Sequence, residues 1–408
     1  VLEKKTGYCL SLSVLYLSIG ERLGLQLYGV VVPGHFFVRY DDGKTRFNIE
    51  TTAGGASKRD EDYLRDSNSA AGPDTIYMKN LNKLGTMSCF FNNLGNVYSE
   101  AGKIDTAREV LETAVELNPT LGEAQTNLGN VYLKLKRTND AIRQYRQALE
   151  INPNDSKTHS NLGNAFSEKG WYSDAVTEYK KSVELDPNFA EGYRNLAIAY
   201  FHQDKYSEAG EQLSVAIRLK PEEADNYVLM GEIYYNQGQV EQAKFYYRKA
   251  LTMNSNIAEA YYGLGMCYGK EGQTEEQKAV FDKAVSLKPD LVAAVVGLGN
   301  IYFAKEEYDK AIGYYSKASA VSPGNGDILY NLGSAYLNNG DDVKATEAYI
   351  QALAGNNNSG AVHKGLTYAY YRQGKYEQAS KHLQKASELG EKVDENLRRA
   401  IQIQLKRP

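Results

Sequence analysis

Hydrophobic and small residues recur along most of the chain with a fixed period. From Ser88 onward a small residue, usually glycine, stands every 34 positions, with Leu or Met before it and an aromatic residue three positions after it. An alanine stands twelve positions after most of these small residues. This pattern predicts two closely packed helices per unit, because small side chains let helix backbones approach. The nine small residues are Gly95, Gly129, Gly163, Ala197, Gly231, Gly265, Gly299, Gly333 and Thr367.

The ends of the expected helices are marked as well. Gly102 and Gly170 stand where the first helix of a unit should end, a place that favours left-handed backbone. Prolines follow many of the second helices. The 34-residue pattern resembles the tetratricopeptide repeat, a pair of antiparallel helices that stacks on its neighbours. The resemblance implies a mostly α-helical, right-handed solenoid of nine helix pairs over residues 88–393, closed by a cap helix over 394–408.

The first 56 residues follow a different pattern. Apolar residues with small residues between them predict a buried helix that carries Cys9 in its first turn and ends near Gly24. Runs at 26–32, 35–40 and 45–49 predict strands, and the Asp-Asp-Gly-Lys before the last run predicts a hairpin turn. Helix then antiparallel sheet is the order of papain-like and transglutaminase-like folds.

The motifs of this segment resemble the bacterial transglutaminase-like core. Gly-Tyr-Cys-Leu-Ser at 7–11 and Pro-Gly-His at 33–35 are followed by an acidic residue, Glu50, before glycines. The family more often has Asp-Pro where this chain has Glu50 and Thr51. The resemblance implies a small α+β domain over 1–56. A polar connector and a docking helix are then expected over 57–87, before the first repeat.

Cys9, His35 and Glu50 are the candidate catalytic residues of this domain. A helix N-terminus favours the thiolate of a cysteine, and a histidine base needs a third group to orient its ring. The resemblance assigns Cys9 as nucleophile, His35 as base and Glu50 as the orienting residue. Asn48 is the alternative orienting residue, because it lies two positions from Glu50 on the same strand face. Arg39 shares the face of His35, where it would contact substrate or form a salt bridge.

The first helices of the early repeats carry a series of asparagines. In the tetratricopeptide family these helices line the concave face, and an amide offers both donors and an acceptor to a peptide backbone of any sequence. The series is similar to the groove of O-linked N-acetylglucosamine transferase repeats, which hold extended polypeptide. The other interpretation is that the amides bond neighbouring turns or stay hydrated. The asparagines are Asn93, Asn96, Asn127, Asn130, Asn161, Asn164 and Asn195.

In later repeats, aromatic residues replace the asparagines on the expected concave face. Tyrosine and phenylalanine provide large contact areas and are enriched at interfaces. These residues either extend the groove or pack between adjacent first helices. They are Phe201, Tyr235, Tyr262, Phe303 and Tyr371.

Composition bears on which classes of partner the protein binds and on the cellular compartment in which it works. The net charge of −4 without a basic block argues against nucleic acid, and no apolar run approaches the roughly 20 residues of a membrane span. Three widely spaced cysteines form neither a disulfide framework nor a zinc pattern, which slightly favours the cytoplasm. No cofactor or metal is expected. Because the chain begins at Val1, we expect a fragment or a processed chain, which leaves export open.

Three functions fit these observations. The first is a scaffold whose groove binds a polypeptide or another copy of the chain. The second is a cysteine peptidase, amidase or acyltransferase whose substrate is recruited by the repeats. The third is a structural subunit that polymerises through its solenoid into a homo-oligomer or filament.

Overall fold

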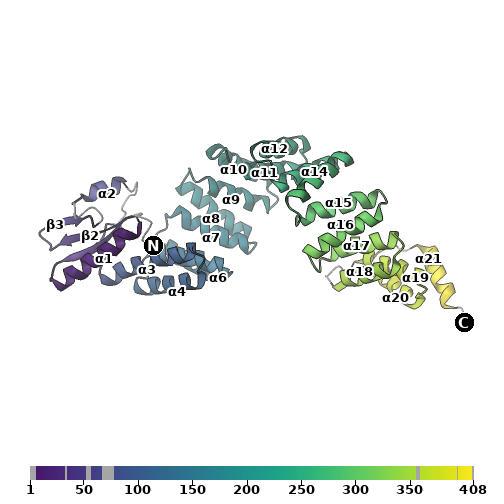
Figure 1. Cartoon of the computed structure of the whole chain (residues 1–408), viewed down its shortest axis with the longest axis horizontal. Coiled ribbons are helices and arrows are strands. Elements are labelled where there is room, and N and C mark those ends of the chain that lie inside the picture. The colour runs from purple at the N-terminus through teal and green to yellow at the C-terminus, as the bar shows by residue number, and fades with distance from the viewer. Residues whose placement is uncertain are drawn as a thin grey trace. The chain divides into compact units, whose positions relative to one another are not determined.

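The computed structural model describes residues 6–32, 35–51, 57–66, 78–354, 359–392 and 394–406, and for 6–11 and 64–66 it defines only the helical backbone. The chain divides into two compact units, Val1–Lys220 and Pro221–Pro408. Unit 1 holds a small α+β domain and a series of helix pairs, and unit 2 consists of further pairs and a final helix (Figure 1).

The α+β domain contains the predicted helix and the three predicted strands. Helix α1 (Thr6–Arg22) precedes strands β1 (Leu27–Val32), β2 (His35–Asp41) and β3 (Arg46–Ile49). The strands form an antiparallel sheet in the order β1-β2-β3. Helix α2 (Asp60–Asp66) follows within the segment expected to be a connector.

The hairpin between β2 and β3 closes through local hydrogen bonds. The Asp42 side chain accepts from the backbone N–H of Lys44 at 2.9 Å and of Thr45 at 2.6 Å. Gly43 has a φ of 82°, a conformation that glycine adopts without steric strain. This turn sets the register that pairs Arg39 with Asn48.

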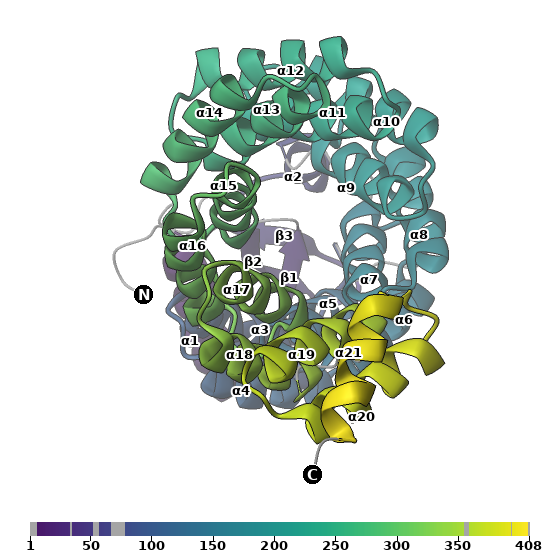
Figure 2. The ribbon, with the colours of Figure 1, turned by 90° about the vertical axis from the view of Figure 1, so that its right-hand side faces the viewer.

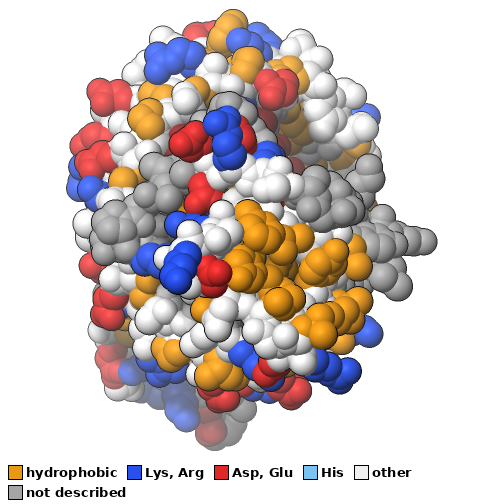
Figure 3. Space-filling model, turned by 90° about the vertical axis from the view of Figure 1, so that its left-hand side faces the viewer, with side chains coloured by type: hydrophobic (Ala, Val, Ile, Leu, Met, Phe, Trp, Pro, Cys, Tyr) orange, Lys and Arg blue, Asp and Glu red, His pale blue; other side chains and the backbone are white. Residues whose placement is uncertain are grey.

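In its described part, from residue 12 onward, helix α1 is only partly buried, which corrects the expectation of a buried helix. Leu15 is 54% exposed and Ile19 is 49% exposed. At Gly20 the helix approaches β1 closely, because a Cβ there would lie 2.3 Å from Leu27 Cδ1. Leu15, Tyr16 and Ile19 of this helix are exposed, and hydrophobic side chains gather on this side of the molecule (Figure 3).

The domain extends past residue 56 and docks directly onto the first repeat. The backbone N–H of Leu81 donates to Gly29 O at 2.8 Å, which places residues 78–81 beside β1. Helix α3 (Lys83–Glu100) begins at once, capped by the Asn82 side chain. Residues 83–87, expected in a separate docking helix, are thus the first turns of α3. Phe36 of β2 packs in one core with Cys89 and Ala114 of the first repeat.

Unit 1 continues with four helix pairs. Each first helix packs against the following second helix, and each pair packs against the next. The pairs are α3 with α4 (Ile104–Leu117), α5 (Gly122–Lys134) with α6 (Thr138–Ile151), α7 (Ser156–Glu168) with α8 (Tyr172–Leu185), and α9 (Ala190–Phe201) with α10 (Tyr206–Leu219).

Unit 2 contains five further pairs, so the described residues form nine pairs in all, as predicted. Figure 2 shows its last pairs, with α17, α18, α19 and α20 packed side by side. The pairs are α11 (Ala224–Asn236) with α12 (Val240–Met253), α13 (Ala258–Lys270) with α14 (Thr274–Leu287), α15 (Val292–Ala304) with α16 (Tyr308–Val321), α17 (Gly326–Asn338) with α18 (Asp342–Ala354), and α19 (Gly360–Arg372) with α20 (Tyr376–Glu388).

The predicted cap helix is present at the end of unit 2. Helix α21 (Glu395–Leu405) buries Leu397 and Ile401 against Ala379 and Leu383 of α20. It thereby covers apolar surface of the last pair, which has no further repeat to cover it in the described part of the chain.

Candidate functional sites

His35 and Glu50 form a close pair on one face of the sheet. His35 is the first residue of β2, and Glu50 directly follows β3. Because side chains alternate along a strand, Asn48 and Glu50 lie on the same side of the sheet. His35 Nε2 lies 2.7 Å from Glu50 Oε1. A carboxylate in this position holds one imidazole tautomer and stabilises a positive charge on the ring.

Tyr63 of α2 contacts the same carboxylate. Its hydroxyl donates to Glu50 Oε1, and its ring stacks on Phe37 with centroids 4.1 Å apart. Burial, followed by the bond to Glu50, raises the pKa of Tyr63, so the phenol keeps its proton and donates. Sequence reasoning missed this residue because it assigned the segment to a connector. The available signal was one aromatic residue in the acidic helix Asp-Glu-Asp-Tyr-Leu-Arg-Asp.

Arg39 and Asn48 belong to a separate, buried network. Arg39 is 0% exposed, and its Nε donates to Asn48 Oδ1 at 2.8 Å. Arg39 Nη2 donates to Asp60 Oδ1 at 2.6 Å, and Asn48 Nδ2 reaches the same atom at 2.6 Å. Of the two open interpretations of Arg39, the structure shows the salt bridge. Asn48, the alternative orienting residue, bonds Arg39, and Glu50 bonds His35.

The side chain of Cys9 lies outside the described residues. The backbone of α1 places Cys9 in the first turn, one helical turn before Ser13. Ser13 Oγ lies 3.0 Å from Thr51 Oγ1, and Thr51 directly follows Glu50. The described part of α1 thus meets the end of β3 at Ser13.

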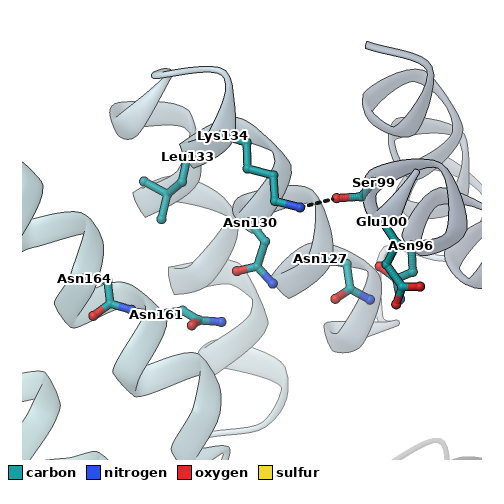
Figure 4. Close-up of a pocket in the computed structure, with 9 residues that line it drawn as sticks. All are labelled: Asn96, Ser99, Glu100, Asn127, Asn130, Leu133, Lys134, Asn161 and Asn164. Carbon is teal, nitrogen blue, oxygen red and sulfur yellow. Dashed lines mark hydrogen bonds between the residues drawn. The ribbon is translucent and has the colours of Figure 1, made fainter. Parts of the chain in front are cut away.

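The first helices α3, α5 and α7 line an open groove of about 600 Å³ in unit 1 (Figure 4). We call it the asparagine groove. Five of the seven predicted asparagines line it, whereas Asn93 and Asn195 do not. Its lining residues are Asn96, Ser99, Glu100, Asn127, Asn130, Leu133, Lys134, Asn161 and Asn164.

Some of the amides bond one another, as one interpretation of the sequence anticipated. Asn127 Nδ2 donates to Asn92 Oδ1 at 2.9 Å, and Asn195 Nδ2 donates to Asn164 Oδ1 at 3.2 Å. Asn92 was not singled out from the sequence. Asn96 and Asn161 have no side-chain hydrogen bond to any residue in the described ranges. The groove therefore combines internally bonded amides with amides that face solvent.

The five aromatic residues expected on this face all contact neighbours within their own unit. Three of them pack against the first residue of the following helix, with ring centroids 5.5 to 5.7 Å apart. Packing within the repeats thus accounts for much of their surface. The contacts are Phe201 with Tyr206, Phe303 with Tyr308, Tyr371 with Tyr376, Tyr262 with Phe281 and Tyr235 with Lys270.

The described residues contain neither a metal-binding cluster nor a membrane-spanning helix. In those ranges, no three His, Cys, Asp or Glu side chains gather in a way that could hold a metal ion. None of the described helices is long and apolar enough to cross a membrane.

Family models match both parts of the chain. Residues 1–80 match the transglutaminase-like superfamily. Models of the tetratricopeptide repeat match 95–136, 129–170, 163–204, 299–340, 224–257, 258–291 and 328–360. The chain therefore belongs to the tetratricopeptide repeat proteins and carries an N-terminal transglutaminase-like region. Its repeats support a general role as a protein-interaction scaffold.

The individual proteins to which the chain is similar share less than a third of their residues with it. The chain is 29% identical over 134 residues to a UPF0162 protein of Xylella fastidiosa, a match that covers 30% of this chain and 47% of that protein. The chain thus spans about half the length of this curated relative. A tetratricopeptide repeat protein of Parabacteroides merdae shares the fold, with a TM-score of 0.53 at 17% identity over 61% of this chain and 98% of that chain. YrrB, described as a TPR protein with an unusual peptide-binding site, is 28% identical over 44% of this chain and 92% of its own, with a TM-score of 0.35.

Proposed function

We propose that the protein is a scaffold that holds an extended polypeptide across the asparagine groove. The observation that carries this proposal is that three consecutive first helices direct their asparagines into one open groove. Amides of this kind bond the main chain of a peptide and do not require a particular side-chain sequence. The partner class that follows is an extended segment of another protein or of a second copy of this chain.

The unbonded amides support binding more than a purely structural role. Asn161 and Asn96 gain no stability from hydrogen bonds to the described residues, yet they face the same groove as Asn127. A peptide main chain would supply partners for them. Lys134 and Glu100 add one charge of each sign to the lining, so the groove favours neither strongly acidic nor strongly basic segments.

A phage-displayed library of random 16-residue peptides, panned on the full chain, tests this proposal. We expect enriched peptides to bind the wild type and to lose binding to the Asn127→Ala/Asn161→Ala variant. The matched control is Asn154→Ala/Asn256→Ala, which truncates two exposed asparagines outside the groove. The proposal fails if no peptide is enriched, or if both variants bind like the wild type.

A cysteine hydrolase or acyltransferase is the second candidate function, and the His35–Glu50 pair at 2.7 Å favours it. In this reaction the Cys9 thiol gives its proton to His35 and the sulfur attacks an amide carbonyl carbon. His35 then returns the proton to the departing amine, which leaves a thioester on Cys9. Water or another amine releases the acyl group. Glu50 holds the His35 ring throughout.

Iodoacetamide labelling of the intact chain, read by peptide mass spectrometry, tests this second function. A working pair makes Cys9 react well below pH 8 and much faster than Cys267, and His35→Ala removes this advantage. Glu50→Gln should weaken it in the same direction. Equal labelling rates of Cys9 and Cys267 would contradict an activated cysteine.

A further inference from the structure

In several of the helix pairs, a tyrosine ring of the second helix packs directly against the small residue of the first helix. In these pairs the second helix carries a tyrosine sixteen positions after the glycine of the first helix. A Cβ on Gly129 would lie 2.5 Å from Tyr145 Cε1, and one on Gly163 would lie 2.6 Å from Tyr179 Cε1. The absence of a side chain at the glycine therefore gives the phenol ring a path from the second helix toward the first.

The phenol hydroxyl meets the residue directly after that glycine. Tyr145 donates to Asn130 Oδ1 at 2.7 Å, and Tyr179 donates to Asn164 Oδ1 at 2.6 Å. The same contact recurs in unit 2, where Tyr315 donates to Asn300 Oδ1 at 2.7 Å. In pairs with Leu or Phe in place of the tyrosine, the residue after the small position is Asn96, Ile198, Met266 or Tyr368.

The direction of these hydrogen bonds follows from burial. Tyr179 is nearly inaccessible, and burial raises its pKa to about 12, so the hydroxyl stays protonated near neutral pH. The hydroxyl donates its one proton to the amide oxygen of Asn164, and this oxygen also accepts a hydrogen bond from Asn195 Nδ2. No described residue accepts a hydrogen bond from Nδ2 of Asn130 or Asn164, and both residues line the asparagine groove.

We infer that Tyr145 and Tyr179 orient Asn130 and Asn164 so that the groove presents amide N–H donors, and that it recognises carbonyl oxygens of an extended main chain. This inference rests on the proposed scaffold function for the identity of the occupant, and it adds which atoms are read. The tyrosines are positioning residues, since they act on the occupant through the asparagines. A free Asn side chain would lose rotamer freedom on binding, whereas these two are already held.

Replacing the donors by acceptors tests the polarity of the groove. We expect Asn130→Asp/Asn164→Asp to lower the affinity for an uncharged 16-residue peptide from the enriched set by roughly 10-fold or more, because two donors are replaced by carboxylate oxygens. Both tyrosines can still donate to the new carboxylates, so the fold is retained. Asn300→Asp, which has the same tyrosine contact in unit 2, is the matched control and should leave the affinity unchanged. Unchanged or tighter binding by the double variant would overturn the inference.

NMR of the free protein tests the orientation without any peptide. With asparagine labelled by ¹⁵N, the side-chain NH₂ protons of Asn164 should show no nuclear Overhauser effect to the Tyr179 ring edge, and their shifts should move in Tyr179→Phe. The signals of Asn161 are the internal control and should stay in place. A strong effect between the Asn164 NH₂ protons and the Tyr179 ring means that the amide is reversed, which contradicts the inference. If the library yields no binder but the amide is oriented as described, the proposed function fails and the orientation stands.

Discussion

Single residues show how neighbours in space decide a role that the sequence leaves open. Glu50 and Asn48 occupy the same strand face two positions apart, and alternation alone allows either of them to orient His35. In the structure Arg39 binds Asn48, and Tyr63 joins His35 at Glu50. The choice depends on Arg39, which lies opposite Asn48 on β2, and on Tyr63 of α2, which contacts Glu50 from outside the sheet.

The two cysteines of the repeats should be unreactive in the native protein. Burial raises the pKa of Cys89 to about 12 and that of Cys267 to about 11. Only the thiolate reacts, so alkylation of both should stay slow up to pH 9 and become fast after denaturation in urea. Labelling at pH 7, 8 and 9 with mass-spectrometric readout checks this. Rapid reaction of Cys267 at pH 8 would show that its burial is not maintained in solution.

At the scale of helices, each pair is held by contacts that the 34-residue pattern already contains. The small residue of the first helix and the large residue sixteen positions later belong to one contact, Gly299 with Tyr315 being an example. The pattern predicted the close approach of the backbones. It did not show that the tyrosine also reaches Asn300 with its hydroxyl, because that depends on the depth and tilt of the ring.

Two alanine substitutions in one repeat should have opposite effects on stability. In Gly299→Ala the new Cβ lies 2.6 Å from Tyr315 Cε1, and we expect a loss of about 1–3 kcal/mol in the free energy of unfolding. Gly313→Ala is exposed in α16 with no atom within 4 Å, and we expect a gain of about 0.5–1 kcal/mol from helix propensity. Urea unfolding followed by circular dichroism distinguishes them. A stabilising Gly299→Ala would contradict the packing described.

The contact between α19 and α20 should weaken in acid. His363 Nδ1 and His382 Nδ1 are 2.8 Å apart, so one ring must donate and the other accept. Burial, then the His363 and Lys381 charges, lowers the pKa of His382 to about 4. Between pH 6.5 and pH 4 the unfolded state binds a proton that the folded state does not, so stability is complete above pH 7 and falls as the pH decreases through this window.

The loss should approach about 2–3 kcal/mol at pH 4, given a shift from 6.5 to about 4. Hydrogen-exchange mass spectrometry of the full chain, corrected for intrinsic rates, would show lower protection in α19 and α20 at pH 4.5 than at pH 7. Helices α9 and α10 provide an internal comparison. His382→Gln keeps a polar contact but should remove the extra pH dependence, and an unchanged pH profile in this variant would rule out His382 as its source.

At the scale of the whole molecule, the repeats make stability a sum of local contributions. Within each of the two compact units, neighbouring pairs contact each other. A unit can therefore form without contacts between residues that are far apart in the sequence. The N-terminal domain is different, because its strands, α1 and the first repeat share one core.

Unit 2 should fold by itself. We expect a fragment of residues 221–408 to show helical circular dichroism and a cooperative thermal transition, because its pairs and α21 cover one another. A fragment of residues 240–408 is the matched control, since it lacks α11 and exposes Tyr247 of α12. It should unfold at a lower temperature. An unfolded 221–408 fragment would show that the units are not independent.

The sequence by itself determined the repeat architecture, the nine pairs, the cap helix and the three strands. These features follow from local periodicity, since each 34-residue unit carries its own apolar seam and its own turn residues. Only the tertiary structure decided which polar groups meet. Glu50 bonds His35 and Tyr63, Leu15 of α1 is exposed, and Tyr179 donates to the amide oxygen of Asn164. Such contacts depend on the approach of separate elements within a few tenths of an ångström, and periodicity does not encode that distance.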